Sequence, residues 1–417
     1  MTAPQRSPLL PLDEALARLL AHASNLFTQE SVAVGEADGR VLAQDVVSAL
    51  HVPPQDNSSM DGYALRCADV GAPGVQLPVS QRIPAGSSGE PLLTGTVARI
   101  FTGAPVPQGA DAIVMQEDCT ALTAAEHGSG MLQVQVNAQP TPGQYIRRAG
   151  EDVARGDVVL ARGQRLGPAE LGLAASIGMD RLKVARRPRV ALFSTGDELV
   201  MPGAVAPQDM PPGAIYNSNR YFLSALLRRM GCVVTDLGIV PDRLDATVQA
   251  LRDAAQAHDV ILTSGGVSVG EEDHIKPAVQ SLGMLEQWHI AIKPGKPFAY
   301  GRIREAHFLG LPGNPVSSFV TFLVLVRPFL LQLQGMHQVA MKSVAARADF
   351  TWARPDKRRE FLRVRRNASG GLDLFPNQSS GVLTSAVWGD GLIDNPPGCA
   401  IAPGDLVRYV SFAELLA

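Results

Sequence analysis

The sequence predicts a multidomain α/β protein built around a doubly wound domain, and three observations carry that prediction. Strand-like and helix-like segments alternate from Arg189 to about residue 332, which is typical of a parallel sheet covered by helices on both faces. Three of the strand-like segments run directly into loops rich in Gly, Ser and Pro. Short apolar runs separated by Gly and Pro precede and follow this region, which indicates β domains on both sides.

Length and composition limit the class of protein. A chain of 417 residues holds about two to four domains, and its hydrophobic content of 46% is ordinary for globular domains. The net charge of −3 argues against a general nucleic-acid binder. The four cysteines form no CxxC pair and no Cys/His cluster, which fits a reducing cytoplasm and gives no zinc site; they are Cys67, Cys119, Cys232 and Cys399.

Neither a targeting segment nor a membrane span is expected. The N-terminus lacks a basic region followed by a continuous apolar core, so we expect no signal peptide. The most apolar run, residues 319–331, contains Arg327 and Pro328, which favours a buried helix over a membrane span. The sequence therefore predicts a cytoplasmic protein.

The N-terminal half combines packing elements with polar turns. Residues 64–145 consist of short apolar runs between Gly and Pro, which predicts a small all-β domain. The polar loops 51–63 and 146–152 crowd acids with hydroxyls or arginines, and composition alone favours exposed turns whose ion pairs contribute little. The remaining elements are an amphipathic helix, a strand and a short helix, predicted over residues 11–23, 41–47 and 168–177.

The alternating region supplies the elements of the doubly wound domain. Apolar, β-branched runs predict its strands over residues 189–193, 232–237, 260–263, 285–292, 298–303 and 307–309. Apolar residues at helical spacing predict its helices over residues 218–230, 242–257, 275–282 and 316–332.

Three loops of this region end strands and are rich in polar and flexible residues. They are Ser194-Thr-Gly-Asp-Glu198, Ser264-Gly-Gly-Val-Ser-Val-Gly270 and Gly310-Leu-Pro-Gly-Asn-Pro315. If their strands are parallel neighbours, the loops meet at the carboxyl edge of the sheet, where open α/β sheets bind ligands. The second loop, between a strand and a helix start, would cradle an anion through backbone N–H groups. The acids at 271–273 indicate Mg²⁺ beside a phosphate, although acids also simply stabilise a first helical turn.

Basic residues near these loops could either bind a ligand or simply be exposed to solvent. Lys293 and Lys296 lie on a rigid Pro/Gly turn and could hold an oxyanion as point charges, or simply be exposed. The run 357–366 has the alternating pattern of a strand, in which every second side chain lies on the same face. One such face, which is either exposed to solvent or binds a ligand, carries Arg359, Phe361, Arg363 and Arg365. Neither a Walker A sequence nor a G-x-G-x-x-G fingerprint occurs, so a P-loop enzyme and a nicotinamide dehydrogenase have no support.

Motifs spread over the whole chain resemble one family when they are taken in order. They are Ser59-Met-Asp-Gly-Tyr-Ala64, Thr102-Gly103, Gly150-Glu-Asp152, Ser194-Thr-Gly-Asp-Glu-Leu199, Asn219-Arg220, the loop from Ser264 to Gly270, Lys293-Pro-Gly-Lys-Pro297 and Leu311-Pro-Gly-Asn-Pro315. Each motif is weakly specific, whereas the ordered set is very specific and spans the chain from about Leu12 to about Tyr409. On these motifs the chain resembles the molybdopterin molybdenumtransferases, the family of bacterial MoeA and of the E domain of gephyrin.

The resemblance implies a protomer of four parts. These are an elongated N-terminal domain from residues 1–46 and 145–182, an inserted β domain from 47–144, a molybdopterin-binding α/β domain from 183–333 and a C-terminal β-barrel from 334–417. It also implies a homodimer, with the cleft between the α/β domain of one protomer and the N-terminal region of the other.

The implied reaction joins molybdenum to molybdopterin. Adenylylated molybdopterin and molybdate are the implied substrates, Mg²⁺ assists cleavage of the adenylate, molybdenum joins the dithiolene and AMP leaves. The molybdopterin adenylyltransferase that supplies the adenylate is a candidate partner, and neither nucleic acid nor membrane is expected as one.

The resemblance also assigns residues. For the catalytic set it implies Asp61, Asp152, Glu198, Asp242, Asp273, Lys293 and Lys296, of which Glu198, Asp242 and Asp273 would hold the metal. For cofactor binding it implies Thr102, Ser194, Thr195, Gly196, Ser264, Gly265, Gly266, Ser268, Gly270, Pro312, Gly313, Asn314, Pro315, Arg359, Arg363, Ser379 and Ser385. One departure is His289, where the family often has a lysine; a neutral imidazole supplies less charge at pH 7.

Two other functions fit the same resemblance. A related enzyme uses the same α/β domain to adenylylate molybdopterin, but the long regions before and after that domain argue against this activity alone. A non-catalytic scaffold is the role of the fold in the animal homologue, whereas the intact acids of the loops favour catalysis.

Overall fold

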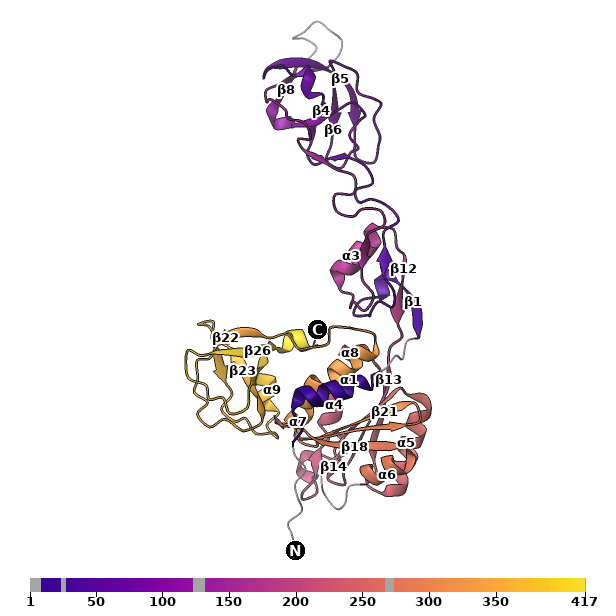
Figure 1. Cartoon of the computed structure of the whole chain (residues 1–417), viewed down its shortest axis with the longest axis vertical. Helices are drawn as coiled ribbons and strands as arrows, with labels where there is room; N and C mark the ends of the chain where they lie inside the picture. Colours follow the sequence, from indigo (N-terminus) through magenta and orange to yellow (C-terminus); the bar gives the residue numbers. More distant parts are fainter. Residues whose placement is uncertain (1–8, 24–27, 123–131, 267–273, 417) are drawn as a thin grey trace.

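The molecule is long, with a small β domain at one end and the doubly wound domain at the other (Figure 1). The computed structural model describes residues 9–23, 28–122, 132–266 and 274–416. A small β domain lies at the far end. It connects through a narrow segment that carries α3, β1 and β12 to the α/β domain, beside which the C-terminal sheet packs (Figure 1).

The α/β domain contains a six-stranded sheet in the order β16-β13-β17-β21-β20-β18. The strands are β16 (Val233–Val240), β13 (Arg189–Thr195), β17 (Val260–Ser264), β21 (Ala306–Leu311), β20 (Pro297–Ile303) and β18 (Met284–His289). The first four are parallel, β20 is antiparallel to β21, and β18 is antiparallel to β20. The parallel arrangement of β13, β17 and β21 confirms that the three loops leave the same edge of the sheet.

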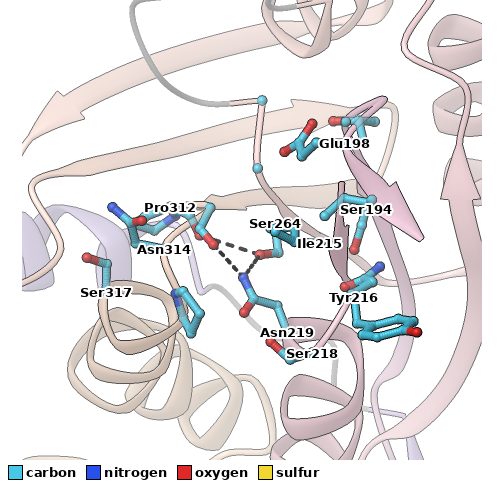
Figure 2. Close-up of a pocket in the computed structure, with 18 of the residues that line it drawn as sticks. Ser194, Glu198, Ile215, Tyr216, Ser218, Asn219, Ser264, Pro312, Asn314 and Ser317 are labelled. Atoms are coloured by element: carbon cyan, nitrogen blue, oxygen red, sulfur yellow. Dashed lines mark hydrogen bonds between the residues drawn. The ribbon is translucent and has the colours of Figure 1, made fainter. Parts of the chain in front are cut away.

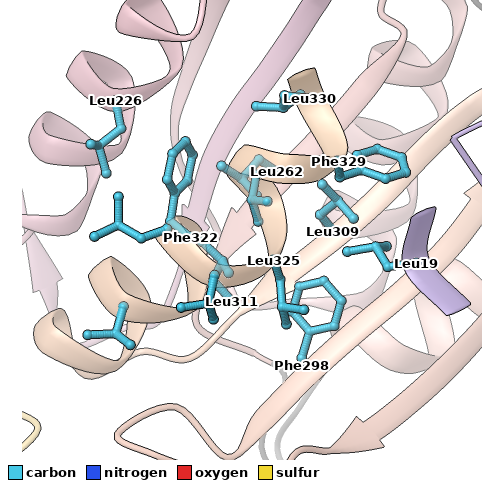
Figure 3. Close-up of a cluster of buried hydrophobic side chains, with 14 of the residues drawn as sticks. Leu19, Leu226, Leu262, Phe298, Leu309, Leu311, Phe322, Leu325, Phe329 and Leu330 are labelled. Carbon is cyan, nitrogen blue, oxygen red and sulfur yellow. The ribbon is translucent and has the colours of Figure 1, made fainter. Parts of the chain in front are cut away.

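Helices cover both faces of this sheet, because its buried strands are apolar on both sides. On β13, Val190 and Leu192 face the core formed with α4 (Asn219–Arg229), whereas Ala191 and Phe193 face the core formed with α5 (Leu244–Ala257) and α6 (Ile275–Leu282). The larger core packs leucine and phenylalanine side chains from helices against the strands (Figure 3).

The closing helix of the domain is continuous but not regular. It comprises α7 (Pro315–Thr321), a π-helical turn (Phe322–Val326) and α8 (Arg327–Leu333). Pro328 has no N–H to donate to the preceding turn, and a local π-helical turn is a known way for a helix to absorb such a defect. Within the described residues, Pro315–Leu333 is the helix long and apolar enough for a membrane span, and 83% of its apolar window is buried inside the protein. The sequence predicted this burial.

The N-terminal helix packs somewhere that the sequence did not predict. Helix α1 (Leu12–Ala21) buries Leu12 and Leu19 in the larger core of the α/β domain, beside α8. The implied division of the chain groups this helix with the elongated segment instead. The sequence does not predict this contact, because the amphipathic patterns of α1 and α8 do not indicate which element each helix packs against. The limits of the domains themselves stay a prediction.

The elongated segment is held together by two short strand pairs. Strand β1 (Gln29–Ala33) pairs with β12 (Arg181–Ala185), and β2 (Val46–Val47) pairs with β11 (Val158–Leu160). Helix α3 (Pro168–Ser176) packs beside them. Within the predicted strand over 41–47, only its last two residues form a named strand, and Val41 and Leu42 make isolated bridges.

The far β domain confirms the prediction of a small all-β unit. Its sheet has the order β7-β4-β6-β5-β9-β8. The strands are β4 (Gly62–Leu65), β5 (Val75–Ile83), β6 (Val97–Ile100), β7 (Ala112–Met115), β8 (Cys119–Leu122) and β9 (Gln133–Val136). A short pair, β3 (Asn57–Ser58) with β10 (Ile146–Arg147), closes the base of the domain where the chain enters and leaves.

The C-terminal sheet has the order β19-β23-β25-β26-β22, with β24 paired to β23. Its own strands are β22 (Val344–Arg347), β23 (Arg359–Arg366), β24 (Leu372–Leu374), β25 (Gly391–Asn395) and β26 (Leu406–Ser411), followed by α10 (Phe412–Leu416). Strand β19 (Ile292–Lys293) belongs to the α/β region and lies parallel to β23. The two domains therefore share a sheet, and among the described residues its strand order is open, so closure into a barrel stays a prediction.

Candidate functional site

A cavity of about 510 Å³ lies where the three loops meet at the carboxyl edge of the central sheet (Figure 2). Strand β16 lies on one side of β13 and β17 on the other, so this edge is the switch point at which open α/β sheets bind ligands. The predicted site residues that the structure brings together here are Ser194, Thr195, Gly196, Glu198, Asp242, Ser264, Gly265, Gly266, Pro312, Gly313, Asn314 and Pro315.

Asn219, at the start of α4, fastens the second and third loops together. Its side-chain nitrogen donates one hydrogen bond to Ser264 Oγ at 2.8 Å and another to the carbonyl oxygen of Gly313 at 2.7 Å (Figure 2). Both amide hydrogens are thereby used, and Asn219 is 8% exposed. The sequence marked Asn219 as part of a motif without giving it a function; the available signal was a polar amide at a helix start beside the ligand edge.

The remaining lining residues escaped prediction because most carry no chemical signal. The short strands β14 (Leu199–Val200) and β15 (Ile215–Tyr216) pair and form one wall. Ile215 is 55% exposed in the described structure, which offers an apolar surface to a ligand. The full set that sequence reasoning missed is Leu199, Ile215, Tyr216, Asn217, Ser218, Asn219, Pro297 and Ser317.

Two carboxylates face this cavity. Gly196 has φ +141°, and a Cβ there would lie 2.6 Å from Glu198 Oε2, so only glycine leaves room for this carboxylate. Asp242 follows β16 and also lines the cavity. The described lining residues include neither Lys nor Arg, so a bound cation would be the group that offsets repulsion between these carboxylates and an anionic ligand. Mg²⁺ is often bound through one or two carboxylates together with substrate phosphates, and these residues fit that requirement.

The predicted lysines lie beside the cavity rather than in its lining. Lys293 Nζ lies 3.2 Å from Glu360 Oε1 and 3.5 Å from Asp356 Oδ2, both from the C-terminal region. Lys296 is exposed. His289 is half-buried, and burial together with Lys296 lowers its pKa, which keeps the imidazole neutral as the sequence indicated.

The C-terminal sheet brings the buried Arg363 to the predicted hydroxyls. Arg363 is 1% exposed and donates to Ser385 Oγ at 3.1 Å and to the carbonyl oxygen of Ser379 at 3.3 Å. Burial lowers the pKa of Arg363 to about 10, so it remains charged at neutral pH. The carbonyl oxygen of Ser380 accepts a hydrogen bond from Val316 N at 2.9 Å, which fixes this loop against the helix that borders the cavity.

Arg359 is engaged in ion pairs. Its guanidinium lies beside Asp394 and donates to Asp13 Oδ1 at 2.8 Å, and the hydrogen bonds to Asp394 raise its pKa. Arg359 thus connects the C-terminal sheet to α1. This bidentate ion pair is enough to give Arg359 a structural role, and a role of Arg359 in ligand binding stays a prediction.

The remaining predicted residues lie in the far part of the molecule. Thr102 donates from its backbone N at 2.7 Å and from Oγ1 at 2.8 Å to Asp61 Oδ1, and the backbone bond lowers the pKa of Asp61. Asp152 lines a separate hollow of about 430 Å³ with Asn57 and Arg147. Asp61 directly precedes β4, so within one protomer it lies far from the α/β domain (Figure 1).

Three predicted residues, Ser268, Gly270 and Asp273, lie outside the described residues. Among the residues that are described, no group of three or more His, Cys, Asp or Glu side chains is arranged to hold a metal ion. The described part of the predicted metal site therefore consists of Glu198 and Asp242.

The doubly wound domain and its cavity define an α/β protein with a ligand site at the switch point of its sheet. Residues 191–332 match the family model described as a probable molybdopterin binding domain. Residues 10–178 match the MoeA N-terminal region (domains I and II), and residues 345–412 match the MoeA C-terminal region (domain IV). The chain therefore belongs to the MoeA family of molybdopterin molybdenumtransferases.

Relatives of known name and structure agree with this membership over most of the chain. The molybdopterin molybdenumtransferase of Haemophilus influenzae is 42% identical and aligns over 79% of this chain and 79% of its own. Molybdopterin molybdenumtransferase 2 of Mycobacterium tuberculosis is 38% identical over 88% of this chain and 90% of its own. The crystal structure of the molybdopterin biosynthesis moeA protein from Pyrococcus horikoshii OT3 is similar with a TM-score of 0.83 and 28% identity, covering 97% of this chain and all of that one.

Proposed function

We propose that this chain is a molybdenum insertase that transfers molybdenum from molybdate to molybdopterin. Its substrate is adenylylated molybdopterin, whose bond to AMP is cleaved so that AMP leaves and the dithiolene takes up molybdenum. The observation that carries the proposal is the cavity at the switch point, where Gly/Ser loops face two carboxylates in a chain that matches the family from residue 10 to residue 412.

The loops would bind the phosphate part of the substrate. Gly265 and Gly266 have φ +95° and +66°, and a Cβ on Gly266 would lie 2.5 Å from Ile275, so the backbone approaches its neighbours closely. Backbone N–H groups of such turns suit an anion without adding a mobile charge. Bracing by Asn219 holds the second and third loops in one geometry, which lowers the cost of ordering them on binding.

Glu198 and Asp242 would hold Mg²⁺, with Asp273 as a third ligand by the family resemblance. Bound there, Mg²⁺ would supply neutralising charge to the phosphoryl oxygens and to the leaving AMP. Lys293 and Lys296 would attract the molybdate oxyanion. The exposed Ser379 would contact the phosphate end of the pterin, and the buried Arg363 and Ser385 would hold its loop in place. The neutral His289 would add no charge to this group.

We further propose a homodimer in which the far region of one protomer completes the site of the other. Asp61 and Thr102 are implied in the chemistry, yet their β domain and the α/β domain, whose loops line the cavity, lie at opposite ends of one protomer (Figure 1). Asp152 lies in the segment between them. A twofold arrangement would allow both to meet. We place the dimer in the cytoplasm, in keeping with the cysteine pattern, and assign the four domains and the closed C-terminal barrel as the family implies.

One experiment tests the proposal directly. Purified protein is incubated with adenylylated molybdopterin and Mg²⁺, with and without molybdate, and AMP is quantified by chromatography. We expect release of AMP that depends on molybdate and yields molybdenum-loaded cofactor. Net synthesis of the adenylate from ATP and molybdopterin would instead assign the adenylyltransferase activity, and binding of the adenylate without either reaction would assign a scaffold.

A further inference from the structure

Glu360 is a fully buried carboxylate at the joint between the C-terminal sheet and the α/β domain. Its side chain is 0% exposed, and Oε1 lies 3.2 Å from Lys293 Nζ. Oε2 accepts a hydrogen bond from Trp352 Nε1 at 2.8 Å, and Asn395 Nδ2 lies 3.5 Å away. A buried charge costs several kcal/mol unless it is paired and hydrogen-bonded, so this arrangement is specific.

The backbone fixes which residues meet at this joint. Strand β19 pairs in parallel with β23, and the register sets Lys293 opposite Glu360. Arg359 N also donates to the carbonyl oxygen of Ala291 at 2.9 Å. The C-terminal sheet therefore holds the start of the Lys293-to-Pro297 turn through both main chain and side chain.

The same turn ends at the cavity. Gly295 has φ +110°, and a Cβ there would lie 2.3 Å from Thr321 Oγ1 on α7, so the turn is packed against this helix. Pro297, at its end, lines the cavity. The turn is consequently confined between the C-terminal sheet and the helix that borders the cavity, and a shift at Lys293 would be transmitted to Lys296 and Pro297.

Lys293 remains reachable while it is held. Its side chain is 38% exposed, and its ammonium lies 5.9 Å from the centre of the Trp352 ring. An ammonium has three donors: Glu360 takes one, Asp356 Oδ2 lies 3.5 Å from it as a second carboxylate, and capacity for a further oxygen ligand remains. Because Glu360 is buried, a ligand can approach Lys293 only from the open side, and the carboxylate acts as an anchor behind the cation.

We infer that Glu360 is a positioning residue that fixes Lys293 and the following turn for the incoming oxyanion. The inference rests on the proposed function, since it takes molybdate as that oxyanion. It makes the C-terminal sheet part of the site, because the sheet supplies the anchor as well as Arg363.

The test compares variants of the full chain by the KM for molybdate and by kcat. In Glu360→Gln the carboxylate is replaced by an amide of the same shape, and we expect about a tenfold rise in KM with little change in kcat. In the Lys293→Ala background the same substitution should leave KM unchanged, since residues that act through one contact are not additive. Asp390→Asn, which removes a carboxylate that accepts from Tyr409 in the same sheet, should lower stability without changing this KM.

Trp352→Phe is the alternative test variant if Glu360→Gln does not fold. It removes the indole donor to Glu360 Oε2 and leaves both Glu360 and Lys293 in place, so we expect a smaller rise in KM that also vanishes without Lys293. A rise of equal size in both backgrounds, or an unchanged KM, would overturn the inference. If the wild-type protein releases no AMP, the proposed function fails instead, and equilibrium dialysis with molybdate alone then compares the same variants.

Discussion

Asn219 Nδ2 lies 2.8 Å from Ser264 Oγ, and this contact joins the helix after the first loop to the strand before the second. The same nitrogen also donates to the carbonyl oxygen of Gly313, at 2.7 Å. One buried side chain therefore sets the spacing of two of the three loops that form the cavity. Removing it should affect both stability and activity.

We expect Asn219→Ala to lower the free energy of unfolding by about 2 kcal/mol, because two buried hydrogen bonds are lost. Asn219→Asp keeps the shape but puts a carboxylate against the carbonyl oxygen of Gly313, and should be at least as damaging. Tyr221→Ala, at a 54% exposed position of the same helix, is the matched control and should change stability by no more than about 0.5 kcal/mol. Urea denaturation measures the free energy of unfolding of all three variants. A fully stable, fully active Asn219→Asp protein would show that Asn219 does not hold the two loops together.

Glu198 and Asp242 should control the dependence of activity on Mg²⁺. Glu198→Gln and Asp242→Asn each remove one charge and keep the shape, so we expect at least about a tenfold higher Mg²⁺ concentration for half-maximal AMP release. Asp197→Asn is the matched control, because Asp197 is an exposed neighbour that does not line the cavity. An unchanged Mg²⁺ titration for both cavity variants would reject the metal site, and loss of the thermal transition would make these acids structural.

His307 should make the protein less stable in mild acid. It is 1% exposed and its Nδ1 lies 3.0 Å from Tyr300 Oη; burial lowers its pKa from 6.5 to about 4. Because the folded pKa is the lower one, the unfolded chain takes up the proton first as the pH falls. Stability from this residue is thus complete above about pH 6.5 and is lost towards pH 4, on the order of 3 kcal/mol in total.

Urea denaturation of the wild-type protein and of His307→Gln at pH 7 and pH 5 measures this linkage. We expect the wild-type free energy of unfolding to fall more steeply with acid than that of the variant, whatever the offset between them at pH 7. Parallel slopes for the two proteins would show that His307 is not the linked group.

The sequence predicted the parallel domain and its ligand edge because local patterns determine them. The strand at Val260 is a continuous apolar run, the helix from Leu244 has a clear helical period, and each loop follows its strand directly. Twelve of the predicted cofactor and catalytic residues line one cavity for this reason, as the lining of the cavity shows. A residue that follows a parallel strand is placed by the strand, whatever lies elsewhere in the chain.

Contacts between distant parts of the chain could not be predicted in this way. The pairing of β19 with β23 and the burial of α1 beside α8 depend on which surfaces meet, and neither segment carries a sign of its partner. Glu360 was accordingly passed over as an ordinary strand residue, although it is buried against Lys293. Ile215 and Tyr216 lack charge and were passed over because their role in the wall comes only from their place beside the loops.

The last prediction concerns the proposed site between protomers, in which Asp61 of one chain would meet Glu198 of the other. Asp61→Ala should abolish AMP release while the adenylate still binds, because Asp61 lies in the far β domain next to Thr102 and not in the cavity. At a Mg²⁺ concentration too low to saturate it, Glu198→Gln should also release little AMP, for the separate reason given above. Each variant alone would then form dimers with two defective sites.

Mixed dimers of these two variants should regain activity. In a mixed dimer, one site combines an intact Asp61 with an intact Glu198, and the other site has both substitutions. If subunits assemble at random, half of the dimers are mixed and half of their sites work, so co-expression should restore about a quarter of wild-type activity. Light scattering at micromolar concentration should give twice the chain mass for every sample. A chain that is monomeric and fully active, or a co-expressed mixture that stays as inactive as its parents, would place the whole site within one protomer.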